Sequence, residues 1–446
     1  MNINVLDLIN DTALNVAKLH EVFSEMNTVD IAEIFESVSR EKVIQIFRIL
    51  PKSIAADVFS YIDSDTQQII VEGLTDSEIR KIIDDLFVDD AVDFIEEMPA
   101  NVVKRVLRNV DETKRQLINH LLQYPDDSAG SIMTTEYVDL REDSTVREAF
   151  DYIRKTGVDK ETIYTCYVIR RDKLLVGVIS AKKLMLANPH DRIGDIMDKN
   201  LVFVYTTDDK EITADLFRKY GLLSMPVVDK EQRLVGIITV DDAVQVIEEE
   251  ATEDFEIMAA LNPSEEPYLK TSVLRHARNR IVWLMVLMLS ATITGIIITY
   301  FEDSLAVLPV LVAFIPMIMD TGGNAGCQSS TLIIRGMAVG EIQVKDALKI
   351  MWKEMRIAVL CGLALGIVNF ARVYLMNGKN ALLSLTITIS VLITVMIAKS
   401  VGCILPIIAK KIKIDPAIMA APLITSIVDA AALFAYFSIA KAILRI

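Results

Sequence analysis

The sequence of 446 residues contains only four cysteines and four histidines. The cysteines are too widely scattered for a disulfide framework or a zinc site, so we expect free thiols in a reducing compartment. Every histidine precedes residue 277, which argues against a zinc or nickel site in the apolar C-terminal part. The sequence also lacks a P-loop, a nucleophile–base pair and a metalloprotease motif, so it does not predict an enzyme.

Charge is scarce in the last part of the chain and abundant before it. Residues 270–446 carry 8 acidic and 17 basic side chains out of 61 and 46 in the whole chain, which leaves 53 acidic and 29 basic side chains for residues 1–269. An acidic part of this size disfavours nucleic acid and attracts cations. The first ten residues lack the pattern of a cleavable signal peptide, so we expect the acidic part to be cytoplasmic.

Five long apolar runs follow residue 280, and each is long enough to cross a bilayer. The basic segments Lys270–Arg280, Arg335–Arg356 and Lys410–Lys413 would lie on one side, which the positive-inside rule makes the cytoplasm. Lys399, inside the fourth run, is expected to snorkel or to pair with an intramembrane acid. The predicted spans are Ile281–Phe301, Leu305–Ile334, Ile357–Met376, Ala381–Ala409 and Pro416–Ile443.

Two carboxylates interrupt the apolar runs, Asp320 in the second and Asp429 in the last. Hydrocarbon cannot solvate a carboxylate, so both must face protein or water. Glycines and amides surround Asp320, and together with the acids they predict a glycine-loosened, oxygen-rich route for a hard cation. Alternatively, the glycines allow close helix packing and the amides bond between helices. The residues concerned are Gly322, Gly323, Asn324, Gly326 and Gln328.

The N-terminal 125 residues contain a helical repeat. Apolar positions from Ile31 to Leu50 recur 24 residues later from Ala55 to Leu74, and a third copy runs from Ala91 to Val110 after an insertion. Units of this length with apolar residues at helical spacing predict stacked helical hairpins in which each unit buries its face on the next.

Residues 128–250 contain a second kind of duplication, in which Leu175–Ser180 recurs as Leu234–Thr239. Each copy is expected to fold as strand, helix, strand, turn, strand and helix, and the tandem looks like a CBS-domain pair. In the second copy Thr239 and Asp241 resemble a ribose-binding pattern, with a cleft near Pro226, whereas the first copy has lysines there. The alternative is that Asp241 only caps a helix.

The pair is followed by a strongly acidic helix, predicted over Val244–Glu256. Glu250, Glu253 and Asp254 share one face of it at spacings of three and four residues, at which like charges repel. A divalent ion that bridges these acids to another domain would remove the repulsion, and so would solvation of an exposed helix.

The whole chain closely resembles the MgtE family of magnesium channels, most specifically at Thr321–Gln328 and Pro422–Asp429. The fold expected is a multidomain membrane protein with an all-α helical-repeat domain, an α/β CBS-domain pair, an acidic connecting helix and a five-helix transmembrane domain. The domain ranges are 1–127, 128–246 (copies 128–190 and 191–246), 247–276 and 277–446. The resemblance implies a homodimer in the plasma (inner) membrane that conducts Mg2+ inward and closes when cytosolic Mg2+ is abundant.

The resemblance also implies roles for single residues. Asp429 would hold a hydrated Mg2+, with Gly322, Gly323 and Asn324 lining the same site; Asp320 is an added acid, and Cys327 stands where many members have a polar residue. Mg2+ would be both substrate and regulator, with ATP as a candidate modulator at Asp241, Thr239 and Pro226. The acids that match the family's cytosolic sensor are Asp90, Asp93, Asp209, Glu211, Asp242, Glu250, Glu253 and Asp254, whereas Gly221 and Gln245 replace acids.

Two other functions compete with a magnesium channel. A broader channel would also pass Co2+ or Mn2+, and nothing in the residues separates it from the first. A membrane-anchored CBS protein that senses nucleotide would use the apolar helices only as an anchor. Asp320 and Asp429 argue against the anchor, because an anchor gains nothing from intramembrane carboxylates.

Overall fold

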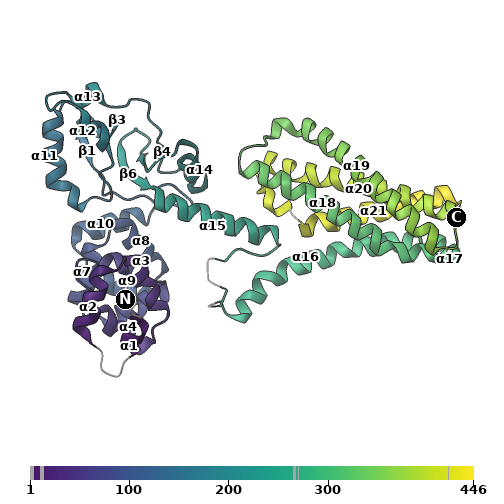
Figure 1. Ribbon diagram of the computed structural model, residues 1–446, viewed down its shortest axis with the longest axis horizontal. Coiled ribbons are helices and arrows are strands. Elements are labelled where there is room, and N and C mark those ends of the chain that lie inside the picture. Colours follow the sequence, from purple (N-terminus) through teal and green to yellow (C-terminus); the bar gives the residue numbers. More distant parts are fainter. Residues whose placement is uncertain (1–4, 11–14, 265–267, 270, 420, 446) are drawn as a thin grey trace. The chain divides into compact units, whose positions relative to one another are not determined.

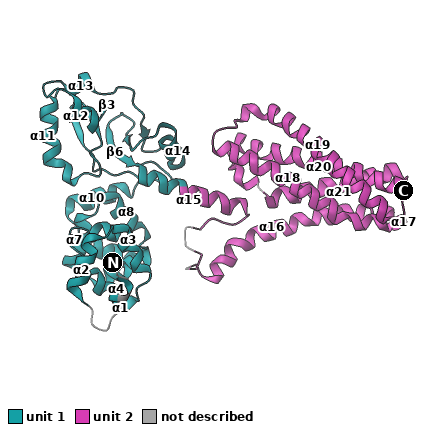
Figure 2. Cartoon of the chain, in the orientation of Figure 1, with its two compact units in different colours: residues 1–247 teal, residues 248–446 magenta. Residues whose placement is uncertain are grey.

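The computed structural model describes residues 5–10, 15–264, 268–269, 271–419 and 421–445. Lys270, counted above among the basic flanks, lies outside these residues. The chain separates into two compact units, residues 1–247 and 248–446 (Figure 2). The division falls inside one helix, α15 (Val240–Met258), which begins as the last helix of the second α/β copy and contains the predicted acidic segment (Figure 1).

The first unit begins with ten short helices. From α6 onward the helices start at residues 64, 76, 88, 100 and 112, so each step is 12 residues long. The 24-residue sequence repeat is therefore two steps, and the insertion before the third copy is one further helix, α7. The helices are α1 (Val5–Asn10), α2 (Val16–Glu25), α3 (Thr28–Glu36), α4 (Arg40–Phe47), α5 (Ala55–Ser60), α6 (Ser64–Gly73), α7 (Asp76–Asp85), α8 (Val88–Glu97), α9 (Ala100–Asn109) and α10 (Glu112–Leu121).

A row of aromatic rings forms part of the core of this helical domain. Phe35, Phe47, Phe59 and Phe94 contact one another edge to face, with ring centroids 5.1 to 6.2 Å apart. All four side chains are buried. The repeated apolar positions of the sequence thus become one continuous core, as expected for stacked helices that each cover their neighbour.

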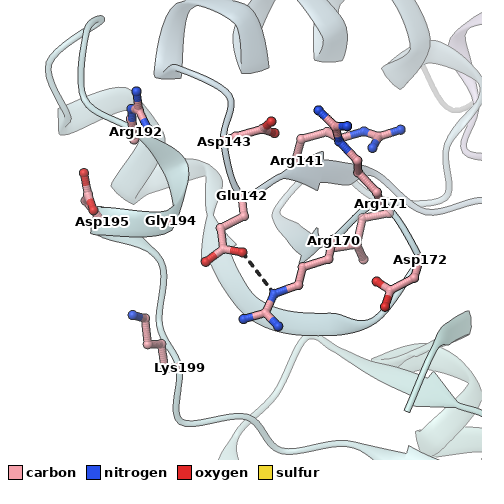
Figure 3. A pocket seen from close by; sticks show the side chains of 11 residues that line it. Arg141, Glu142, Asp143, Arg170, Arg171, Asp172, Arg192, Gly194, Asp195 and Lys199 are labelled. Carbon is pink, nitrogen blue, oxygen red and sulfur yellow. Dashed lines mark hydrogen bonds and ion pairs between the residues drawn. The ribbon is translucent and has the colours of Figure 1, made fainter. Parts of the chain in front are cut away.

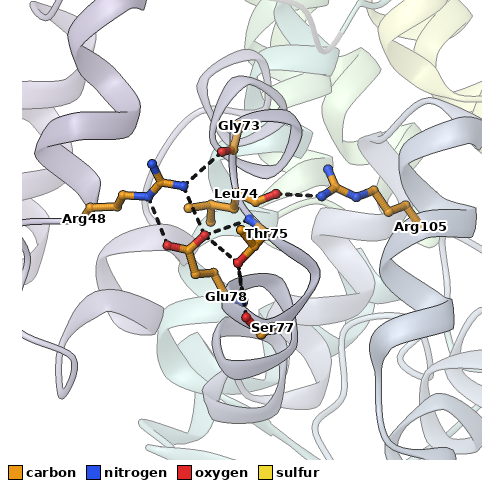
Figure 4. A network of polar contacts seen from close by, with 7 residues as sticks. All are labelled: Arg48, Gly73, Leu74, Thr75, Ser77, Glu78 and Arg105. Atoms are coloured by element: carbon orange, nitrogen blue, oxygen red, sulfur yellow. Dashed lines mark hydrogen bonds and ion pairs between the residues drawn. The ribbon is translucent and has the colours of Figure 1, made fainter.

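Two arginines, one after α4 and one on α9, bind the C-terminal end of α6 (Figure 4). Arg48, which directly follows α4, donates to the carbonyl of Gly73 and to the Glu78 carboxylate. Arg105 of α9 donates to the carbonyls of Val71 and Leu74, which α6 leaves without a helical partner at its C-terminus. These contacts satisfy backbone groups that the short helices would otherwise expose.

The duplicated region forms two three-stranded sheets with the same topology. In each, a short first strand pairs in parallel with the second, and the second pairs antiparallel with the third. The register is also the same, with Thr165 opposite Ser180 in one sheet and Ser224 opposite Thr239 in the other. The strands are β1 (Asp139–Arg141), β2 (Thr165–Ile169) and β3 (Leu175–Ser180), then β4 (Val204–Tyr205), β5 (Ser224–Val228) and β6 (Leu234–Thr239).

Four helices accompany these strands before α15 begins. The first copy carries α11 (Val146–Thr156) and α12 (Ala181–Leu186), and the second carries α13 (Ile193–Ile196) and α14 (Lys210–Tyr220). Both α11 and α14 follow a short first strand and begin with a side-chain cap, from Thr145 and Asp209 respectively. The predicted order of strands and helices is therefore confirmed in both copies.

The second unit contains five helices that are long and apolar enough to cross a membrane, among the residues described. They are α16 (Val273–Tyr300), α18 (Ile315–Ala338), α19 (Ala347–Met376), α20 (Ala381–Lys411) and α21 (Ala421–Leu444). A short helix α17 (Glu302–Val307) follows α16, and a 3-10 turn, η2 (Pro309–Phe314), leads into α18. All five predicted spans are present, and α19 begins ten residues before its predicted span, so it includes Glu354.

Close approach of α18 to its neighbours explains the glycines of this helix. An added Cβ on Gly322 would lie 2.9 Å from the Thr394 side chain, and one on Gly402 of α20 would collide with the backbone of Gly326. The expectation of glycine-loosened backbone is wrong, because α18 is one unbroken helix from Ile315 to Ala338. The glycines remove side chains where helices touch, as the packing alternative predicted.

Candidate functional site

A polar stripe runs along one face of α18. Asp320, Asn324 and Gln328 follow one another at four-residue intervals, and all three side chains are exposed in the single chain. Four residues are slightly more than one turn, so the stripe extends about 12 Å along the helix. Within the described residues neither the Asn324 nor the Gln328 amide forms a hydrogen bond to another helix of the chain. The alternative that these amides bond between helices is therefore not supported within one chain.

A second carboxylate lies beside this stripe. Asp429, near the middle of α21, is half-buried and lies close enough to Asp320 for the two charges to repel each other. The Cys327 thiol is also near Asp429 and donates to the carbonyl of Ala421 at 3.7 Å. The site thus offers two carboxylates and two amide oxygens, which are ligands for a hard cation, and one softer sulfur.

The stripe cannot face lipid. A carboxylate exposed to hydrocarbon costs several kcal/mol, and two acids with two amides cost more. The face of α18 that carries Asp320 must therefore be covered by protein or by a water-filled path when the helices lie in a membrane. The glycines behave differently, because Gly322 and Gly323 are buried against α20 and α21.

A second group of acids gathers in the first unit, where the helical domain meets the α/β copies. Asp89 and Asp90 occupy the first turn of α8. Glu136, just before β1, accepts hydrogen bonds at 2.9 Å from the backbone N–H of Val88 and from the Thr134 hydroxyl. Glu161 comes from the segment before β2, and its Oε2 atom, like Oδ1 of Asp89, is buried without a hydrogen-bond partner.

Burial and mutual repulsion raise the pKa values of these acids. Desolvation, followed by the charges of neighbouring acids, raises the pKa of Asp90 to about 7 and that of Glu161 to about 8. Desolvation and the charge of Asp241 raise the pKa of Asp242 to about 6. For Asp90 such a pKa corresponds to roughly 4 kcal/mol against the charged form, more than a typical hydrogen bond contributes.

The same environment extends to neighbouring side chains. Desolvation and the charges of Asp90 and Asp242 also raise the pKa of Asp93, one turn further along α8. Burial lowers the pKa of Lys114, a nearby cation whose ammonium donates to the carbonyls of Asp84 and Leu86. No three Asp, Glu, His or Cys side chains of the described ranges already converge as a metal-binding group. The all-oxygen donor set nevertheless fits a hydrated Mg2+, which is held by few carboxylates and keeps several waters.

Comparison with known proteins identifies the family. Residues 26–127 match the MgtE intracellular N domain, residues 129–189 and 193–249 match CBS domains, and residues 315–439 match a divalent cation transporter domain. The chain is 34% identical to the magnesium transporter MgtE of Thermus thermophilus over 96% of its length and 95% of the relative's. The chain belongs to the MgtE family. The MgtE of Bacillus subtilis is 30% identical over 96% of this chain and 95% of its own.

Two solved structures resemble the soluble part. The cytosolic domain of the Mg2+ channel MgtE in complex with ATP is 35% identical, with a TM-score of 0.50 over 52% of this chain and 95% of that one. The soluble part of a magnesium transporter is 28% identical, with a TM-score of 0.52 over 55% of this chain and 96% of that one. The family membership makes the chain a membrane transport protein with cytosolic N-terminal domains and five membrane-spanning helices.

The other predicted sensor residues lie on two helices. Asp209 caps the N-terminus of α14 through the backbone N–H of Ile212, and Glu211 is exposed in the first turn of that helix. Glu250, Glu253 and Asp254 lie on α15. Desolvation, then the charges of Asp415 and Glu253, raises the pKa of Asp254.

Several of these acids were not predicted from the sequence. Asp89, Glu136, Glu161 and Asp415 belong with the acidic clusters but sit in loops or beside a predicted position. Gln328 was named in the sequence among the amides near Asp320, and the structure places it on the polar stripe four residues after Asn324. An acid in a loop belongs to no helical or strand repeat, so its place in the cluster could not be predicted from residue spacing.

The predicted nucleotide residues make capping contacts. The Thr239 hydroxyl donates to the carboxylates of Asp241 and Asp242, the latter at 2.7 Å. Pro226 is buried in β5. Asp242 also accepts from the backbone N–H of Thr239 at 3.3 Å, which is a capping contact, whereas Asp241 accepts from the Thr239 hydroxyl. Nucleotide binding at Asp241 stays a prediction.

Residues of both α/β copies line a separate cavity of about 670 Å³ (Figure 3). It lies where β1 and β2 end, with Arg141, Arg171, Arg192 and Lys199 around it. Arg170 pairs with Glu142 at 3.2 Å and is partly neutralised. Asp143, Asp172 and Asp195 also line the cavity, so it combines guanidinium groups, which bind phosphate, with carboxylates, which repel it.

Proposed function

We propose that the protein is a channel that imports Mg2+ across the plasma membrane along the polar stripe of α18 and closes when cytosolic Mg2+ rises. Family membership establishes magnesium transport, and the path and the gating are the proposal. The observation that carries it is the polar stripe of α18 with Asp429 beside it, at a depth where lipid cannot solvate it.

The exposed stripe supports a homodimer. A second copy related by a two-fold axis would face the first with the same Asp320, Asn324 and Asp429, which would enclose the polar groups between the subunits. Each subunit then contributes equivalent oxygen ligands to one path. Such a ring suits Mg2+ because the ion keeps most of its water and is bound through few direct contacts.

Within this path we assign the main role to Asp429. Its carboxylate would hold the hydrated ion, with Asn324 contributing an amide oxygen and Asp320 a second charge. Gly322 and Gly323 would contribute by letting α18 approach α20 and α21 closely, so that backbone oxygens of the same turn come near the path. The polar stripe thus combines charge for attraction with neutral oxygens for passage.

Cytosolic Mg2+ would close the channel by neutralising the clustered acids. Asp90, Asp93 and Asp242, joined by Asp89, Glu136 and Glu161, would share bridging ions between the helical domain and the α/β copies. Bridging ions would also bind at the connecting helix, to Glu250, Glu253 and Asp254 together with Asp415. On α14, Asp209 and Glu211 would add further carboxylates to the sensor. Without the ion, repulsion favours separation of these acids.

ATP is proposed as a modulator of this closure rather than as a fuel. The chain has no P-loop, and a related cytosolic domain is known in complex with ATP. The ribose hydroxyls would bond to Asp241 in the second copy. A nucleotide that binds only the closed arrangement would raise the apparent affinity for Mg2+, and Mg2+ would raise the affinity for nucleotide by the same factor.

A broader divalent channel is favoured by one observation, the Cys327 thiol near Asp429. Sulfur is a softer ligand than oxygen and binds Co2+ better than Mg2+. The Cys327→Ser variant separates the two functions. If the ratio of Co2+ to Mg2+ flux falls in this variant, the thiol widens selectivity.

The proposed path is tested by growth of a cell that lacks magnesium uptake. The wild type should restore growth at low Mg2+, and Asp429→Ala should not, although it reaches the membrane in equal amount. Asp303→Ala, which removes an exposed acid at the start of α17, is the matched control and should restore growth. Rescue by Asp429→Ala at the wild-type level would exclude the assigned path, and failure of the wild type would favour the anchored sensor.

A further inference from the structure

Three buried polar side chains join three membrane helices. The Ser329 hydroxyl of α18 donates to Oε2 of Glu354 on α19 at 2.6 Å, and the Lys399 ammonium of α20 donates to the same hydroxyl at 3.1 Å. Lys399 and Glu354 form an ion pair at 3.6 Å. Their exposures are 1% for Ser329, 8% for Glu354 and 5% for Lys399, so solvent supplies none of these contacts.

The three side chains form a neutral unit in a place where single charges are unfavourable. A lone ammonium or carboxylate buried among membrane helices is strongly destabilising, whereas a hydrogen-bonded pair is tolerated. The sequence predicted that Lys399 snorkels or pairs with an intramembrane acid, and the structure confirms pairing. Apolar residues would pack these helices as well, so a pair retained here points to specificity of arrangement.

The pair lies about one turn from a backbone contact between α18 and α20. Gly326 and Gly402 are three residues from Ser329 and Lys399 respectively, and their backbones are too close for a side chain on Gly402. A glycine contact lets helices slide or rotate because nothing interlocks. The directional bonds of Ser329 prevent this, since rotation of α18 would break both of them.

The same helix carries the polar stripe on its other face. Ser329 directly follows Gln328, and successive residues are 100° apart around a helix. If α18 rotated by about 100° about its axis, Ala325 would therefore take the place of Asn324 at the path. We infer that the Lys399–Ser329–Glu354 contacts are a positioning device that fixes the rotation of α18 and thereby the ion selectivity of the path.

This inference rests on the proposed path along α18, and its test does not depend on which ion is transported. In full-length protein whose four native cysteines are replaced by serine or alanine, Gln328→Cys should react with a water-soluble thiol reagent much faster than Ala325→Cys. In Lys399→Met the two rates should approach each other. The wild-type arrangement of α18 is thus measured directly.

Flux supplies the second readout. In vesicles containing purified protein, Lys399→Met should lower Mg2+ flux about tenfold and raise the ratio of Co2+ to Mg2+ flux. The reversed pair Lys399→Glu with Glu354→Lys should restore both values in part, because neutrality and the bridging contact return. Lys411→Met, which removes an exposed lysine from the same helix, should match the wild type.

The outcomes separate the possibilities. Equal selectivity and an unchanged ratio of thiol rates in folded Lys399→Met protein would overturn the inference while leaving the proposed path intact. If Lys399→Met does not fold, Glu354→Gln replaces it, since the amide can still accept from Ser329. Glu354→Gln should shift both readouts in the same direction by less, and wild-type values in that variant would likewise overturn the inference.

Discussion

The two units of the chain both bury carboxylates, but they neutralise them in opposite ways. In the first unit Asp89 and Glu161 have buried oxygen atoms without a hydrogen-bond partner, and further acids surround them. In the membrane unit Glu354 has Lys399 and Ser329 beside it. We propose that the fixed counter-ion holds the membrane helices in one arrangement, whereas the buried acids of the first unit depend on a diffusible cation. Under this proposal the first unit responds to cations and the membrane unit does not.

The largest effect is expected when the responsive part loses its charge. The combined variant Asp89→Asn, Asp90→Asn and Glu161→Gln removes the repulsion that Mg2+ would otherwise screen, so the helical domain should stay against the α/β copies without the ion. Limited proteolysis in the segment after α10 measures this. The wild type should be cut quickly in chelator and slowly in millimolar Mg2+, and the variant slowly in both.

The control variant also removes three carboxylates, but from exposed helix surfaces away from the acidic cluster. Glu25, Glu33 and Glu36 are exposed acids of α2 and α3, and their combined change to glutamine should leave the response to Mg2+ as in the wild type. If the control behaves like the cluster variant, net charge rather than the cluster drives the change. If the cluster variant still needs Mg2+ for protection, these acids are not the sensor.

The next effect concerns the part that stays in place. A Cβ on Gly402 would run into the backbone of Gly326, whereas one on Gly295 of α16 would meet nothing within 4 Å. Gly402→Ala should therefore destabilise the membrane domain by about 1–3 kcal/mol, as overpacking does. Gly295→Ala should be neutral. Thermal unfolding in detergent, followed by loss of the intact peak in gel filtration, compares them, and equal stability would mean that the close approach is not essential.

The sequence predicted elements better than the contacts between them. The five spans and the two α/β copies followed from long apolar runs and from a duplicated segment, both of which are local signals. Glu354 was assigned to a cytosolic connection because Lys349, Lys353 and Arg356 surround it. In the structure α19 starts at Ala347 and carries Glu354 into the bundle, where Lys399 meets it.

The acidic site shows the same limit. Asp90 and Asp242 came from the family resemblance, but Glu136 and Glu161 precede short strands without a repeating pattern. Their proximity to α8 depends on how the helical domain packs on the α/β copies, with Val88 donating to Glu136 across 48 positions in the chain. Long-range contacts of this kind leave no mark on local composition.

A smaller effect should appear on changing pH. The raised pKa values of Asp242, Asp90 and Glu161, about 6, 7 and 8, exceed the ordinary values of 3.8 for Asp and 4.5 for Glu. The compact form therefore binds protons more tightly than the separated form. Its metal-free stability is greatest near pH 4 and falls as the pH rises toward 8.

In chelator the first unit should thus resist proteolysis at about pH 5.5 and lose this protection by about pH 8. Added Mg2+ should have its larger effect at the higher pH, because protons and Mg2+ neutralise the same carboxylates. The cluster variant should respond to neither. Protection in chelator that rises with pH would contradict the assigned direction, and the thiol rates on α18 should stay constant across the same range.

The smallest effect is expected from nucleotide, because Asp241 already accepts a hydrogen bond from Thr239 in the absence of any ligand. Binding must replace this contact, so the net gain is small. Calorimetry with ATP at low and saturating Mg2+, corrected for the Mg2+ that ATP itself chelates, should detect at most one site per subunit, and Asp241→Ala should weaken it.

Arg171→Ala distinguishes the site at Asp241 from the separate cavity where Arg141, Arg171 and Arg192 lie (Figure 3). If ATP affinity falls in Arg171→Ala and not in Asp241→Ala, the nucleotide occupies that cavity and the prediction for the second copy is wrong. If neither variant changes binding, or no heat is measured with the wild type, the prediction of a nucleotide site at Asp241 is wrong and its contact with the Thr239 hydroxyl is only structural. Loss in Asp241→Ala alone, with closure at lower Mg2+ when ATP is present, would make the second copy a modulator of the same acidic cluster.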